Sequence, residues 1–106
     1  MEEKKKKHRI QIEFDENTGQ GHYANFAMVT HSQAEFILDF IRLLPGMTKA
    51  KAKSRIIMAP VHVKTLLMML QDNINKFEDK FGEIKVAKQT GLPEIKLKTP
   101  DDLLPN

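Results

Sequence analysis

The sequence predicts an α+β domain, in which an antiparallel meander of about four strands is followed by one long helix in a second layer. Three observations support this fold class. Short apolar segments follow one another along the first half of the chain. The links between them are short, which favours antiparallel pairing of consecutive strands. The segment Pro60–Phe81 then carries apolar residues at helical spacing.

The composition fits one folded domain without disulfides. The chain has 106 residues, of which 41% are hydrophobic and 29% charged. Cysteine is absent, which excludes disulfides, thiol catalysis and cysteine-based zinc sites. We therefore expect a reducing, cytoplasmic setting, since no apolar signal segment follows the first lysines and no apolar run has the length of a membrane span.

The lysine run and the Gly and Pro residues near the C-terminus divide the chain into three parts. Residues 1–8 form a charged arm, residues 9–84 a single α+β domain, and residues 85–106 a tail expected to be extended or disordered. The net charge is +3, from seventeen Lys and Arg against fourteen Asp and Glu. Four of the seventeen lie at residues 4–7, so the rest of the chain is close to neutral.

The first two strands are predicted from alternation. In residues 9–14 the apolar side chains Ile10, Ile12 and Phe14 share one face, as in a half-buried strand. Residues 15–21 contain two glycines and are predicted to form the hairpin turn. Residues 23–31 are predicted as the second strand, with apolar residues on both faces.

Residues 32–45 fit either a strand or a helix. Ser32 and Glu35 have the spacing of a helix capping box, and the apolar residues that follow could line one helical face. The aromatic and β-branched content favours a strand, which is the interpretation we adopt. Residues 54–59 are the fourth strand candidate, closed by Pro60.

The long helix is the clearest element. Pro60 suits its first turn and Gly82 its C-terminal end. Its apolar seam repeats every 3.5 residues on average, as in coiled coils. The seam residues are Val63, Leu67, Leu70, Ile74, Phe77 and Phe81. They fit a helix packed on its own sheet at least as well as a seam between two chains.

Two segments of the sheet are apolar on both faces, whereas one helix covers only one face. Exposed apolar patches above a few hundred Å² normally mark an interface. We therefore expect a homodimer or a complex with another protein, formed through the second sheet face, the helix seam, or both.

Four stretches together resemble a known family. They are Tyr23-Ala24-Asn25, then Glu35-Phe36 with Asp39-Phe40, then residues 54–60, and finally Phe77-Glu78 with Phe81-Gly82 and Ile84. The chain resembles, over residues 9–84, a small bacterial family of unknown function. The resemblance implies no reaction and no catalytic residues. It does imply a transcription-associated role, because some members are encoded near RNA polymerase genes.

Nucleic-acid binding is the alternative function. Lys49, Lys51 and Lys53 alternate, with Arg55 next in phase, so an extended connector would project all four to one side. With the lysines at residues 4–7 they could neutralise several phosphates. Aromatic residues do not interleave with these charges, as stacking on single strands would require.

No catalytic or metal-binding constellation is predicted. The four histidines, His8, His22, His31 and His62, lack the spacing of a helical zinc site. Asp39 is expected to form a salt link with Arg42 or Arg55. We therefore expect a non-catalytic oligomeric binding or scaffold module without a cofactor.

Overall fold

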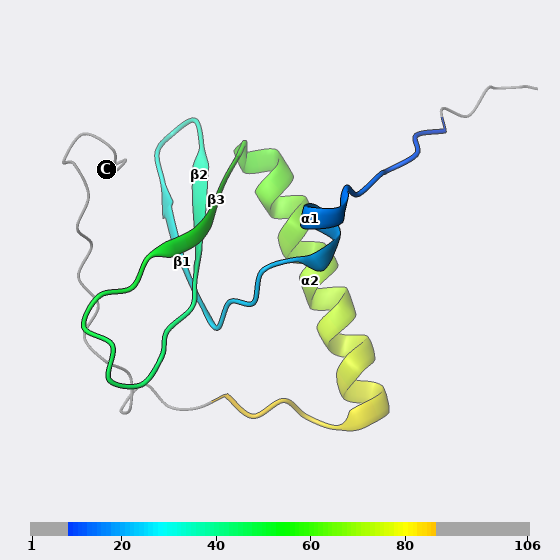
Figure 1. Ribbon diagram of the computed structural model, residues 1–106. Helices are drawn as coiled ribbons and strands as arrows, with labels where there is room; N and C mark the ends of the chain where they lie inside the picture. The colour runs from blue at the N-terminus through cyan, green and yellow to red at the C-terminus, as the bar shows by residue number, and fades with distance from the viewer. Residues whose placement is uncertain (1–8, 87–106) are drawn as a thin grey trace, which may run out of the picture.

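In the computed structural model, which describes residues 9–86, three antiparallel strands precede one long helix (Figure 1). The elements are α1 (Glu16–Gln20), β1 (Phe26–His31), β2 (Phe36–Ile41), β3 (Ala52–Met58) and α2 (Pro60–Phe81). The strands lie in the order β1-β2-β3. The α+β class is confirmed, but the sheet of the described chain has three strands rather than four. The predicted charged arm and nearly all of the predicted tail lie outside the described residues.

The central strand β2 carries the core. Its side chains Ile37, Leu38 and Ile41 are the buried hydrophobic residues among those described, and Asp39 is buried between them. β1 and β3 pair with β2 along its two edges, so each side chain of β2 has cross-strand neighbours on both sides. The strand interpretation of residues 32–45 is therefore confirmed, and the helical alternative is wrong.

The Ser32 and Glu35 spacing serves a turn rather than a helix. The Ser32 hydroxyl accepts hydrogen bonds from the N–H groups of Ala34 and Glu35, at 3.2 and 3.3 Å. The Ser32 N–H in turn donates to the carbonyl of Glu35, at 2.9 Å. A serine side chain can cap either structure in this way, which explains why the sequence pattern was ambiguous.

Asn25 fastens the start of β1 to the chain that leaves β2. Its side-chain oxygen accepts from the Leu43 N–H at 2.7 Å, and its side-chain amide donates to the Leu43 carbonyl at 3.0 Å. The Asn25 N–H also donates to the carbonyl of Ile41. The side chain thereby replaces a backbone pair just beyond the last paired residues of the two strands.

The N-terminal segment differs from the prediction. Residues 9–14 do not belong to the sheet, and the expected hairpin turn over residues 15–21 is instead the short helix α1. Asp15 begins this helix, since its carboxylate accepts from the Thr18 N–H at 2.7 Å, and this hydrogen bond lowers the pKa of Asp15. Gly21 ends α1 with a φ of 75°, where glycine is favoured.

α2 has the predicted bounds and is joined to the sheet by one residue. Ala59 alone separates it from β3, and the Ala59 carbonyl accepts from the N–H of Val63 at 3.1 Å. At its other end Gly82 has a φ of 102°, and the Glu78 carboxylate accepts from the Ile84 N–H at 2.9 Å. No helix in the described range of 9–86 is both long and apolar enough to cross a bilayer.

Replacing Asn25 by alanine should lower the free energy of unfolding by about 1–3 kcal/mol, because both backbone groups of Leu43 lose their partner. Urea denaturation followed by circular dichroism measures the change. Gln33→Ala, at an exposed position in the β1–β2 turn, is the control and should leave stability unchanged. Equal stability of the two variants would show that the Asn25 clamp contributes nothing.

Candidate interaction surfaces

The predicted seam of α2 is largely exposed. None of the 22 residues of this helix is buried. Val63 is half-buried, whereas the other five seam residues are between 40% and 67% exposed. These five are Leu67, Leu70, Ile74, Phe77 and Phe81. The seam residues therefore form an apolar surface, most of which the sheet of the same chain leaves uncovered.

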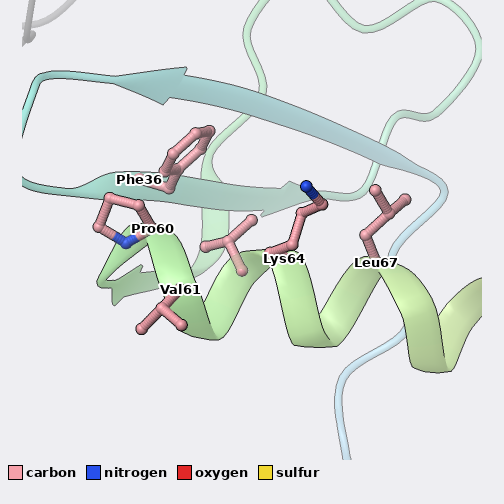
Figure 2. A pocket seen from close by; sticks show the side chains of 6 residues that line it. Phe36, Pro60, Val61, Lys64 and Leu67 are labelled. Atoms are coloured by element: carbon pink, nitrogen blue, oxygen red, sulfur yellow. The ribbon is translucent and has the colours of Figure 1, made fainter.

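The first turns of α2 lie against the sheet, and the rest of the helix does not. Val63 and Leu67 line an open hollow of about 530 Å³ together with Pro60 and with Phe36 from β2. In Figure 2 the side chain of Leu67 extends towards the strands, whereas Val61 points away from them. Contacts between α2 and the strands are few, and Figure 1 shows the far end of the helix standing clear of the sheet.

The far end of the seam is an aromatic surface. The rings of Phe77 and Phe81 lie one helical turn apart, with centroids separated by 5.0 Å. The Lys80 ammonium lies 5.4 Å from the centroid of the Phe81 ring, within the range of a cation–π contact. On another side of the helix, Lys76 and Asp72 form an exposed ion pair at 3.1 Å. α2 thus combines an apolar seam with polar residues elsewhere, as an amphipathic docking helix does.

The ion pair predicted for Asp39 forms with Arg55. The two residues are directly opposite each other on β2 and β3, and the guanidinium binds both carboxylate oxygens, at 2.7 and 2.9 Å. The Asp39 side chain is 7% exposed and that of Arg55 33%. The hydrogen bond to Asp39 raises the pKa of Arg55, so the guanidinium remains charged. The Asp39 carboxylate can be buried because the Arg55 guanidinium pairs with its charge.

This ion pair distinguishes Arg55 from the other three residues of the predicted basic set. Lys49, Lys51 and Lys53 line a common hollow of about 320 Å³, but Arg55 does not line it. The fourth cation of the hollow is Arg42, with Leu44 and Met47 completing its walls. Within residues 9–86, none of these four cations forms an ion pair with a carboxylate.

Sequence reasoning missed Arg42 as a member of the basic set. From the sequence, Arg42 is expected only as a possible partner of Asp39. The strand register contains the information, because Ile41 pairs with Ala52 and the next residues on each side are Arg42 and Lys51. An antiparallel continuation of this register brings the two cations opposite each other.

The described histidines do not come together. His31 stacks on Phe36 in the β1–β2 hairpin, with ring centroids 5.3 Å apart, whereas His62 lies in the first turn of α2. His22 lies between α1 and β1, and His8 is outside the described residues. In residues 9–86 there is no group of three or more metal-binding side chains.

Arg55→Ala should lower the free energy of unfolding by about 3 kcal/mol, because it leaves the Asp39 carboxylate buried without a partner. The double variant Asp39→Leu, Arg55→Leu should recover most of this loss, since it removes both charges. Urea unfolding of the single and double variants gives the coupling between the two residues. Additive losses in the double variant would contradict a coupled pair.

The comparisons with known proteins agree with the resemblance noted in the sequence. Neither a curated protein nor a solved structure matches the chain. One family model does match, over residues 1–86, and its description is "Protein of unknown function (DUF3467)". This match covers most of the 106 residues. The chain therefore belongs to the DUF3467 family of proteins of unknown function.

Proposed function

We propose that the protein is a non-catalytic homodimeric binding module in which the α2 seams of two copies pack against each other. The observation that supports this proposal best is the exposure of the seam, whose residues Leu67 to Phe81 lie free along one helix. At roughly 100 Å² for each half-exposed large apolar side chain, these five residues present about 500 Å². Patches of that size on soluble proteins normally mark an interaction site.

A second copy is the simplest occupant of the seam. The average spacing of 3.5 residues is that of helices that pack side by side in a left-handed supercoil. The same seam on two copies is self-complementary, which is the requirement of a two-fold dimer. A dimer would also bury Phe77 and Phe81, the aromatic residue type enriched in interface cores.

Several polar residues that would otherwise be candidates for chemistry serve the fold. Asp39 is bound by Arg55, Asn25 by the backbone of Leu43, and Glu78 by the Ile84 N–H. These contacts account for the side chains by positioning strands and ending α2. They support a binding role rather than a catalytic one.

Leu70→Asp should raise the dimer dissociation constant at least about 100-fold, because it places a charge in the middle of the seam. Asn75→Asp is the matched control. It adds the same carboxylate off the seam, where Asp can still accept the hydrogen bond from Gln71. Sedimentation equilibrium distinguishes 12.2 kDa for the monomer from twice that mass for the dimer. A native protein that stays monomeric at high micromolar concentration would contradict the proposed function.

Nucleic-acid binding through the basic hollow is a second candidate function. It is supported by the convergence of Arg42 with Lys49, Lys51 and Lys53 around one concavity. Four cations that each neutralise one phosphate contribute about −3.6 to the slope of log affinity against log salt on duplex DNA. A transcription-associated role, as the family resemblance implies, would suit such a site.

Replacing Lys49, Lys51 and Lys53 together by alanine should make that slope less steep by about 2.7, because three of the four cations of the hollow are removed. Fluorescence anisotropy with a labelled DNA duplex and an RNA strand, measured at several salt concentrations, tests this. Alanine at Lys76, Lys80 and Lys85 is the control, since it removes the same charge from other parts of the chain. No binding by the native chain at low salt, or equal slopes for the two triple variants, would exclude the hollow as a nucleic-acid site.

A further inference from the structure

Residues 9–14 have the sequence of a strand but no strand to pair with. Ile10, Ile12 and Phe14 are 84%, 79% and 68% exposed. In the described part of the chain, the backbone of this segment makes no hydrogen bond to the sheet. An alternating apolar segment that leaves both its side chains and its backbone groups in water lacks the burial that its pattern is suited to.

The three-stranded sheet offers two open edges, and they differ in chemistry. β3 carries Lys53 and Arg55, and charged side chains on an edge strand oppose pairing with another chain. β1 has the sequence FAMVTH, which contains no lysine, arginine, acidic residue or proline. It also has six residues, the same length as the segment 9–14. β1 is therefore the edge that can accept a further strand.

The N-terminal segment of the same copy is directed away from this edge. Figure 1 shows the chain before α1 running outward, away from the sheet. α1 fixes this direction, because its Asp15 cap, the Gly19 N–H bond to the Asp15 carbonyl and Gly21 close the turn. In this arrangement residues 9–14 do not pair with β1 of the same copy.

We propose that residues 9–14 of each copy add as a fourth, antiparallel strand to the β1 edge of a second copy. This exchange of residues 9–14 between two copies, called the N-terminal strand exchange, rests on the proposed homodimer and specifies how its sheets are completed. It is reciprocal, as a two-fold dimer requires, and it uses strand addition to an open edge, a common mode of recognition.

One register matches several side chains of the two segments. With Ile12 opposite Val29, the antiparallel order places Phe14 opposite Ala27, so a large side chain lies beside a small one. The same register places Gln11 opposite Thr30. The Thr30 hydroxyl is buried and has no hydrogen-bond partner among the described residues, and the Gln11 amide can both donate to it and accept from it.

Residues 9–14 also provide interface area in addition to that of the seam. A standard interface takes about 800 Å² from each partner, whereas the exposed seam offers about 500 Å². The three apolar side chains of residues 9–14 are more exposed than those of the seam and supply about 300 Å². The seam and residues 9–14 together therefore reach the size of a stable dimer.

Cysteine cross-linking tests the exchange directly, because the chain has no cysteine of its own. Under mild oxidation, the full-length Ile12→Cys, Val29→Cys variant should form a covalent dimer of twice 12.2 kDa on a non-reducing gel. The control Gln11→Cys, Val29→Cys places the two sulfurs on opposite faces and should remain uncross-linked. A disulfide within one copy, or no preference for the Ile12 pair, would overturn the exchange.

A backbone variant provides an independent measurement. Gln11→Pro with Ile12→Pro removes two adjacent N–H groups. Because successive N–H groups of a strand point in opposite directions, one of the two is the group that would donate to β1. Residues 9–14 make no sheet hydrogen bonds within their own copy, so the fold of each copy should be unchanged, while the dimer dissociation constant should rise at least about tenfold. An unchanged constant would overturn the N-terminal strand exchange and leave the dimer through α2 standing. A monomeric native protein would instead overturn the proposed function itself.

Discussion

The pairing of Asp39 with Arg55 is the constraint on which the sheet depends. A carboxylate at the centre of the middle strand is tolerated only because a guanidinium on the next strand binds both of its oxygens. The pair is satisfied only when Asp39 and Arg55 are opposite each other, so a slip of β3 by one residue would separate them and turn every side chain to the other face. Asn25 fixes the other side of β2 in a similar way, through the backbone of Leu43.

The stretches that carry the family resemblance coincide with such contacts. Asn25 lies in the first, Asp39 in the second and Arg55 in the third, while the fourth contains Glu78 and Gly82, which end α2. Each of these residues joins two segments or ends one element. The stretches therefore describe how the three-stranded sheet and its helix are held together.

Much of the fold was predictable because it is local. Pro60 and Gly82 bracket α2, and the aromatic and β-branched residues of β2 favour a strand, so both elements follow from short segments. The structure of residues 9–14 was predicted less well. Alternation in residues 9–14 indicates strand propensity but names no strand to pair with, and the expected hairpin turn is a short helix capped by Asp15. Arg42 was missed for the same reason, since its place depends on strand register rather than on spacing.

The single residue between β3 and α2 has a mechanical consequence. Ala59 is the single residue between β3 and α2, and its carbonyl already accepts the first helical hydrogen bond, so the link between sheet and helix is short. At 1.5 Å per residue the helix extends roughly 33 Å beyond this joint. Because the helix is this long, a small rotation of the backbone at Ala59 would displace Phe81 over a large distance. A partner bound at the far end of α2 would therefore fix the orientation of the sheet relative to the helix.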